Sequence, residues 1–291
     1  MAKKAMGWKP FPHLDADFSY PGAALKKHWA RLHIGDQEPF PAAQYLARLC
    51  KAHPEVARAI PKFDGDFGAL SEKLQDAWRS YHQGDFQHAA QIGTSLGPVG
   101  YSVADKATSI YANYLEPSTA TRLKLLETVM TRAEEARALL PEHPNAHYQY
   151  AYALGRHSQG TSVLQALAEG VAPKIRDALA QTLDLAPGHA EAHIASGTFH
   201  AQIIEKVGSL LGGITYGVSR DKALEHYRRA LTLHPASAIA RIEYAWGLVS
   251  MFGQSRIDEA TRLVVDAAHV EPADAMERLD VALAESRLEE G

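Results

Sequence analysis

The chain of 291 residues is 46% hydrophobic and 22% charged and has a formal net charge of −4, a composition typical of a soluble globular protein. This slightly acidic balance argues against nucleic-acid binding, which calls for clustered Lys and Arg. No apolar run approaches the roughly 18 residues of a transmembrane helix, so the sequence predicts no membrane span.

The N-terminal region, residues 1–21, is predicted to be an irregular leader, because it is rich in Pro, aromatic and Asp residues and has no helical period. Lys3 and Lys4 are not followed by the apolar stretch of a secretory signal. The single cysteine, Cys50, excludes an internal disulfide and is expected to be a buried thiol. Together these features predict a cytoplasmic protein.

Two early segments share a Leu-x3-Trp-x5-Gly-Asp spacing that is followed by an Ala-Ala pair. Leu and Trp four residues apart share one helix face, and Gly-Asp suits a tight turn between antiparallel helices. Each segment is therefore predicted to form a helical hairpin. The matching positions are Leu25, Trp29, Gly35, Asp36, Ala42 and Ala43 in the first segment, and Leu74, Trp78, Gly84, Asp85, Ala89 and Ala90 in the second.

Apolar residues recur at helical spacing through the rest of the chain, and no strand-like alternation occurs. A final segment, 274–288, has an acidic outer face and is predicted to be a solubilising cap. The sequence therefore predicts an all-α fold. The expected helices are 101–115, 118–140, 145–157, 172–185, 189–204, 221–234, 237–251 and 256–270.

A repeated pattern runs through the second half of the chain. Each unit ends in a proline, and a very small side chain lies ten residues after each of the first two prolines. Alanines lie at matching distances before the later prolines. Small residues at a helix crossing allow the axes to approach to about 8–10 Å. The repeated positions are Pro187, Pro235 and Pro272, then Gly197 and Ala245, and then Ala223, Ala230, Ala260 and Ala267.

These repeats resemble tetratricopeptide (TPR) repeats, most clearly over residues 185–272. The resemblance implies a right-handed α-solenoid of about six TPR-like helical hairpins with a C-terminal capping helix. It also implies one domain over residues 22–291 that follows the leader. Proteins of this kind bind protein or peptide partners.

Two consecutive hairpins are longer than the 34-residue TPR unit and are predicted to carry inserted loops near 156–171 and 205–220. The second loop, which contains Leu210, Leu211 and Ile214, is expected to fold back over a groove. The paired insertions are similar to those of two divergent TPR groups, the T components of TRAP transporters and the regulators of microtubule dynamics.

His189, His193 and His200 lie on one face of a predicted helix. His189 and His193 are one turn apart, a spacing that could chelate an ion, but His200 is too distant along the helix axis to join them. We interpret His193 and His200 as packing residues and predict no metal site, and the pair His189/His193 stays an open question. Neither a serine-nucleophile motif nor a phosphate-binding loop is complete. The sequence therefore predicts no catalytic site and no cofactor.

The leading hypothesis is a non-catalytic scaffold that binds a protein or peptide segment in the concave groove of the array. The alternative is a small-molecule carrier whose pocket is closed by the two insertions. The sequence leaves open the partner and the oligomeric state, including a homo-oligomer. The candidate binding residues are Tyr152, Arg156, Lys206, Tyr216, Ile242 and Trp246.

Overall fold

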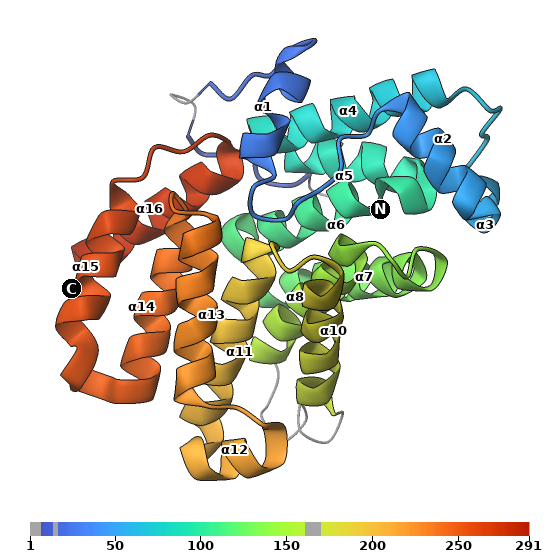
Figure 1. The fold of residues 1–291 in the computed structure, drawn as a ribbon. Helices are drawn as coiled ribbons and strands as arrows, with labels where there is room; N and C mark the ends of the chain where they lie inside the picture. Colours follow the sequence, from blue (N-terminus) through green and yellow to red (C-terminus); the bar gives the residue numbers. More distant parts are fainter. Residues whose placement is uncertain (1–6, 14–16, 161–169, 291) are drawn as a thin grey trace, which may run out of the picture. The chain divides into compact units, whose positions relative to one another are not determined.

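The computed structural model describes residues 7–13, 17–160 and 170–290 (Figure 1). Every regular element in these residues is a helix, which confirms the predicted all-α class. The contacts group the chain into two compact units. The first unit is residues 1–28 and 39–162, and the second unit is residues 29–38 and 163–291. The single domain that the sequence predicts stays a prediction.

The first unit contains most of the helices of the N-terminal half. Helix α1 (Ala24–Leu32) begins in this unit and ends in the second. The remaining elements are α2 (Ala43–Ala52), α3 (Pro54–Ala59), α4 (Phe67–Gln83), α5 (Phe86–Ser95), the 3₁₀ turn η1 (Gly97–Gly100), α6 (Tyr101–Ile110), the π turn η2 (Tyr111–Leu115), α7 (Thr119–Leu139) and α8 (Pro144–Gln159).

The second unit contains the C-terminal helices, which begin and end close to the predicted bounds. The C-terminal helix α16 occupies the predicted cap segment. The elements are α10 (Val171–Leu185), α11 (Ala190–Val207), α12 (Ser209–Tyr216), α13 (Arg220–Leu233), α14 (Ala238–Phe252), the 3₁₀ turn η3 (Gly253–Arg256), α15 (Ile257–Ala268) and α16 (Ala275–Glu290). None of the helices that the structure describes is both long enough and apolar enough to cross a membrane.

The Gly84-Asp85 turn joins α4 and α5 as the sequence predicts. Gly84 has a left-handed backbone (φ 91°) and ends α4, and the Asp85 carboxylate accepts a hydrogen bond from the His88 amide at the start of α5. A Cβ at position 84 would also lie 2.6 Å from the Phe11 ring. Glycine is therefore required here by its backbone angle and by the packing of the leader.

The matching segment around Gly35-Asp36 does not form the same turn. The positive φ falls on Gln37 (52°), and the Asp36 carboxylate binds the His33 ring at 2.9 Å and the Glu38 amide at 3.2 Å. The chain then runs without a helix to α2, which begins at Ala43. The predicted hairpin turn is therefore wrong here, because the Asp36 carboxylate binds the His33 ring and the Glu38 amide and does not cap a following helix.

The described parts of the leader contain no helix but pack closely on the first unit. The Trp8 ring stacks on Tyr111 with ring centroids 4.2 Å apart, and the Trp8 amide donates to Gln87 Oε1 at 3.0 Å. The Arg79 guanidinium donates to the Tyr20 and Gly22 carbonyls. Side chains of the helices thus satisfy polar backbone groups of the leader, and the Trp8 ring of the leader covers Tyr111.

Small residues bring the hairpins of the second unit together, as the repeat pattern predicts. Tyr227 of α13 is fully buried, and a Cβ at Gly197 or at Gly247 would lie 2.8 Å or 2.7 Å from its ring. The Tyr227 ring also stacks on Tyr244 with centroids 5.1 Å apart. Helices α11, α13 and α14 therefore share one aromatic core that only glycine at these two positions admits.

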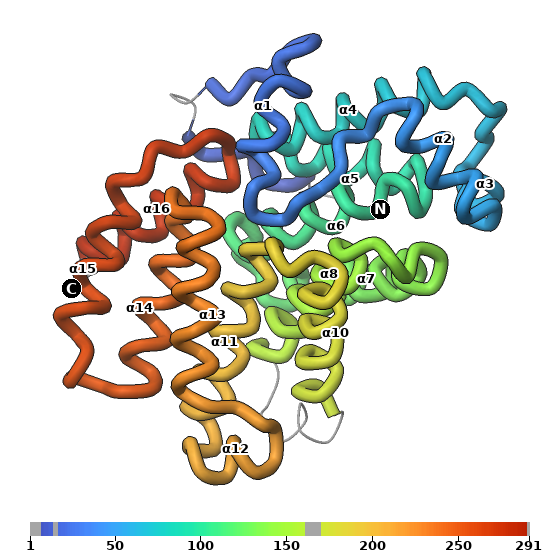
Figure 2. The backbone as a smooth tube through the Cα atoms, in the orientation of Figure 1, coloured from blue at the N-terminus to red at the C-terminus, as the bar shows by residue number. Residues whose placement is uncertain are grey.

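The insertion near 205–220 is a helix, where the sequence predicts a loop. Gly208 (φ 82°) ends α11, and Gly217 (φ 69°) ends the short helix α12. Figure 2 shows α12 across the shared end of α11 and α13. The glycines at both ends act as expected, but the residues between them are regular. Most of the other predicted insertion, residues 161–169, lies outside the described residues.

An ion pair ties residues 29–38 to the C-terminal helix within the second unit. The Arg31 guanidinium binds both carboxylate oxygens of Glu277, at 2.6 and 2.8 Å. Glu277 also accepts a hydrogen bond from the Ala273 amide at 2.7 Å. The same segment contacts the start of α11, since the Glu191 amide donates to the Gly35 carbonyl at 3.0 Å. A stretch from near the N-terminus therefore completes the second unit.

Candidate functional site

The strongest candidate surface is the face where α11 and α14 pack against each other in the second unit. Two hydrogen bonds cross between the helices: Thr198 Oγ1 donates to Glu243 Oε2 at 2.9 Å, and Ser250 Oγ donates to Glu205 Oε1 at 3.3 Å. Each of them joins a hydroxyl to a carboxylate. The face therefore holds two ordered carboxylates in fixed positions.

Trp246 lies on α14 between Glu243 and Ser250, the α14 residues of these two hydrogen bonds. At about 100° per residue, its side chain is within about 60° of both Glu243 and Ser250 around the helix axis. The indole is half-buried. A half-exposed aromatic surface flanked by carboxylates suits an apolar or cationic side chain of a binding partner.

The buried core holds one of these carboxylates in place. The Tyr227 hydroxyl lies 3.1 Å from Thr198 Oγ1, and Thr198 in turn donates to Glu243. Burial raises the pKa of the Tyr227 phenol well above its ordinary value, and the nearby Glu243 charge adds to that shift. The phenol therefore stays protonated and fixes the direction of the relay from Tyr227 through Thr198 to Glu243.

Ile242 is not part of this exposed face. It is 8% exposed and packs in a core cluster with Ala267 of α15 and Val281 and Ala284 of α16. The capping helix covers it, so its apolar surface stabilises the fold and is not available to a ligand.

Tyr152 and Arg156 are brought together on α8 of the first unit. The Arg156 guanidinium carbon lies 5.3 Å from the centre of the Tyr152 ring, one helical turn away. Both side chains are half-buried. This cation–π pair presents a positive charge on an aromatic support, which suits an acidic group of a partner.

Lys206 and Tyr216 mark the two ends of the inserted segment. Lys206 is exposed in the last turn of α11, and Tyr216 is half-buried in the last turn of α12. The apolar residues between them do not fold back over a groove as expected, since Leu210, Leu211 and Ile214 are 81%, 56% and 79% exposed. The α12 backbone turns these side chains outward because Gly212 occupies its inner face.

The histidines of α11 form a cluster with a residue that the sequence pattern did not include, His226 of α13. His193 Nδ1 lies 2.9 Å from His226 Nδ1, and the rings of His226 and His200 stack with centroids 5.8 Å apart. His193 Nε2 faces the Pro187 carbonyl at 3.2 Å, so in the neutral ring this nitrogen donates and Nδ1 accepts from His226. These imidazoles pack α11 against α13, which agrees with the interpretation of His193 and His200 as packing residues.

Burial keeps this cluster uncharged. Desolvation, reinforced by the neighbouring His226 and Lys222, lowers the pKa of His200 to about 4. Desolvation and the His193 charge lower the pKa of His226 to about 4. Within the described part of the chain, no three His, Cys, Asp or Glu side chains converge as metal ligands. The ring of His189 is used otherwise, because its Nδ1 accepts the Ala192 amide and caps α11.

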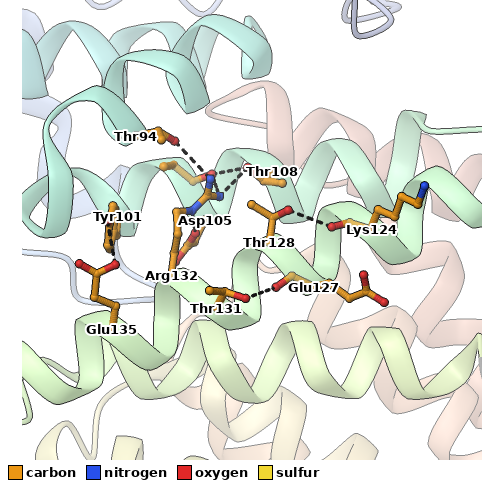
Figure 3. Close-up of polar contacts among 11 residues, drawn as sticks. Thr94, Tyr101, Asp105, Thr108, Lys124, Glu127, Thr128, Thr131, Arg132 and Glu135 are labelled. Carbon is orange, nitrogen blue, oxygen red and sulfur yellow. Dashed lines mark hydrogen bonds and ion pairs between the residues drawn. The ribbon is translucent and has the colours of Figure 1, made fainter. Parts of the chain in front are cut away.

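A second polar cluster joins α6 and α7 in the first unit (Figure 3). Arg132 Nε donates to the Asp105 carboxylate at 2.6 Å, and the other guanidinium nitrogens donate to Thr94, Thr108 and the Ala104 carbonyl. Desolvation raises the pKa of Asp105 to about 7, against the lowering effect of Arg132. Since Arg132 makes four hydrogen bonds to protein groups on two neighbouring helices and its own Asp105 partner is buried, this cluster is a structural link between helices.

Comparisons with known proteins bear on the fold. The sequence matches no family model and no curated protein. Among solved structures, the chain is similar to a thermophilic TPR protein of Thermus thermophilus, with a TM-score of 0.52 and 18% identity over 74% of this chain and 98% of that chain. The fold is a TPR-type helical repeat. At this identity the likeness concerns the fold alone, so the narrower resemblance to T components and regulators of microtubule dynamics stays a prediction.

The TPR-like register predicts the position of Trp246 but not the residues that hold its surroundings. Thr198 and Glu243 lie on different helices, and their hydrogen bond depends on the approach of α11 to α14. A sequence signal was present nonetheless: Glu243, Trp246 and Ser250 follow one another at helical spacing on a single face. A polar–aromatic–polar stripe beside a glycine crossing point identifies such a surface.

Proposed function

We propose that the protein is a non-catalytic scaffold and that the α11–α14 face of its second unit binds a peptide segment of a partner protein. The TPR-like fold supports a binding role in general. The observation that carries the proposal is Trp246, half-buried on the same side of α14 as Glu243 and Ser250, which bond to Thr198 and Glu205 of α11. An aromatic anchor with two carboxylates favours a partner segment that combines an apolar side chain with Lys or Arg.

The other candidate residues enter the proposal separately. Tyr152 and Arg156 form a second contact surface, on the first unit, for an acidic part of a partner. Lys206 follows Glu205 at the end of α11, and Tyr216 belongs to the adjoining α12. The proposal places the scaffold in the cytoplasm, and the buried free thiol of Cys50 supports a reducing compartment. Self-association is left to experiment.

Binding to an array of short peptides of varied charge tests the proposal. Full-length protein is expected to select peptides with an aromatic or aliphatic residue next to Lys or Arg. Trp246→Ala should reduce the affinity for the selected peptides by about 30-fold, because it removes an interface anchor. Glu243→Gln should reduce the preference for basic residues with less effect on total affinity.

A matched control is Val265→Ala, which shortens an exposed aliphatic side chain on α15. It should bind like the wild type. The proposal fails if Trp246→Ala, with unchanged helix content and melting temperature, binds the selected peptides as tightly as the wild type. Binding of small apolar compounds without any peptide selection would favour the carrier alternative.

A further inference from the structure

Helix α12 presents an unpartnered aliphatic face. Leu210, Leu211 and Ile214 are 81%, 56% and 79% exposed, whereas every other exposed large aliphatic side chain in the described residues is 38% or 39% exposed. At about 100° per residue the three lie within about 100° of arc on one side of the helix. Apolar side chains gathered at such exposure indicate a surface that meets something other than water.

The opposite side of α12 is firmly seated on the second unit. Gly212 is buried, and a Cβ there would lie 2.9 Å from Val218, 3.3 Å from Ile203 and 3.5 Å from Val207. These aliphatic neighbours come from the end of α11 and from the segment that leads into α13. The helix therefore lies across the end of the hairpin (Figure 2). Its three aliphatic side chains are the ones left exposed to solvent.

The uncharged stretch that contains α12 has a basic residue directly at each end, and exposed acids, Glu205 and Asp221, lie one position further out. Residues 207–219 contain no charged side chain and are bracketed by Lys206 and Arg220, both exposed. Lys222 adds a third cation, and its ammonium lies 3.2 Å from the Gly217 carbonyl at the end of α12. Of the neighbouring acids, Glu205 accepts the Ser250 hydroxyl and Asp221 lies in the first turn of α13. The uncharged stretch is thus flanked directly by cations on both sides.

We propose that α12 docks the second unit onto an anionic lipid bilayer. The three side chains form a protrusion, and a fluid acyl layer accepts an irregular aliphatic protrusion without a complementary groove. Lys206 and Arg220 lie at either end of the inserted segment, where long basic side chains extend to the headgroups. The Arg220 guanidinium carbon lies 5.1 Å from the centre of the Phe252 ring, which supports this cation beside the lipid surface. Three aliphatic residues and a few cations give weak, reversible binding, comparable with a single acyl anchor. The proposal does not depend on peptide binding at Trp246.

Vesicle flotation with the full chain tests the proposal. Wild-type protein is expected to float with vesicles of phosphatidylcholine and phosphatidylserine, less with phosphatidylcholine alone, and less as NaCl rises. The double variant Leu210→Ser/Ile214→Ser should lose about tenfold or more of the binding, because it removes most of the inserted aliphatic surface. Lys206→Ser/Arg220→Ser should remove the preference for phosphatidylserine.

The matched control is Val265→Ser/Leu288→Ser, which replaces two exposed aliphatic residues on α15 and α16 and should float like the wild type. Three results would overturn the proposal. The wild type could fail to float with phosphatidylserine vesicles, or the Leu210/Ile214 variant could float equally well. The third is a self-associated species, seen by sedimentation velocity without vesicles, that only the Leu210/Ile214 variant loses, since a second copy would then cover this face.

Discussion

Tyr227 shows how single residues set the spacing of the helices in the second unit. Its buried ring fills the space that two glycines leave on α11 and α14. Its hydroxyl positions Thr198, and through it the carboxylate beside Trp246. One side chain therefore serves both the stability of the core and the order of the candidate binding face.

The contact of Gly197 with Tyr227 leads to a stability prediction. Gly197→Ala places a methyl group 2.8 Å from a fully buried ring that has no room to move. We expect a loss of about 1–3 kcal/mol in the free energy of unfolding. Urea denaturation should show it as a lower midpoint at constant slope.

Gly213→Ala is the control, since the nearest atom to its Cβ is 3.5 Å away and it also lies in a helix. Alanine there should be neutral, or stabilising by up to about 1 kcal/mol. Equal destabilisation by both substitutions would mean that the close approach of α11 to Tyr227 is not the reason why position 197 requires glycine.

The histidine cluster predicts acid sensitivity. The pKa values of His200 and His226 fall to about 4 in the folded protein, below the ordinary 6.5, so the unfolded chain binds more protons between these values. The stability that these groups contribute is therefore complete above about pH 6.5 and is lost as the pH falls toward 4. Discounted for partial exposure, we expect about 1–2 kcal/mol for the pair.

His200→Phe keeps an aromatic ring on the His226 stack and removes one titrating group. Its free energy of unfolding, measured by urea denaturation between pH 4 and 7, should vary less with pH than that of the wild type. The exposed His269→Phe serves as the control and should keep the wild-type slope. An unchanged slope in His200→Phe would show that the cluster does not resist protonation.

At the scale of elements, one buried ion pair links α7 to the fully packed helix α6. Asp105 is 2% exposed and takes its charge partner from the opposite helix. Arg132→Met should cost about 1–3 kcal/mol at pH 7, because it removes the ion pair and, with the pKa of Asp105 rising further, leaves a buried neutral carboxyl without its hydrogen-bond donor. Adding Asp105→Asn should restore part of that loss in a thermodynamic cycle measured by urea denaturation.

Two results bear on this link. Lys124→Met, an exposed change on α7, should be near neutral. Asp105 also titrates in the opposite sense to the histidines: its pKa is raised from 3.8 to about 7, so its contribution is complete below about pH 4 and declines as the pH rises through 7. Asp105→Asn should therefore make stability rise more steeply with pH, and a shallower rise would contradict the buried-carboxylate account.

Local pattern predicted most elements and failed where the partner was distant. Helix α13 was expected at 221–234 and spans Arg220–Leu233, because its capping residue Ser219 and the closing Pro235 flank it closely in the sequence. Helix α12 was expected as a loop, because four glycines in ten residues conceal a helix that is stabilised by packing on Ile203 and Val218. The repeat pattern predicted that Ile242 lies on an open face. It could not show that α16 covers this residue, because that contact joins residues about 40 positions apart in the sequence.

At the scale of the whole molecule, residues 29–38 belong to the second unit although they precede most of the first. The spacing around Gly35-Asp36 suggested a local hairpin, and no local pattern could reveal an ion pair with Glu277. The candidate binding residues divide in the same way between the units. The sequence therefore predicted the repeat type but carried no signal that residues 29–38 group with the second unit.

Arg31→Ala tests the grouping. It removes the ion pair with Glu277 at the start of α16, together with both hydrogen bonds between the two side chains. Amide hydrogen exchange should speed up across residues 274–282, while α4 and α7 exchange at wild-type rates. Lys27→Ala, an exposed change on the same helix, should leave α16 unaffected. Uniform acceleration across the chain, or none in α16, would contradict a local link.

The bond between Arg31 and Glu277 has a consequence for how the protein reaches its native state during translation. The two residues are 246 positions apart. At about 5–20 residues per second, a ribosome needs about 10–50 s to go from one codon to the other. During that interval residues 29–38 leave the exit tunnel without their eventual neighbour, so α16 must be synthesised before Arg31 can pair with Glu277. A chaperone that shields residues 29–38 in nascent chains would then raise the yield of correctly folded protein.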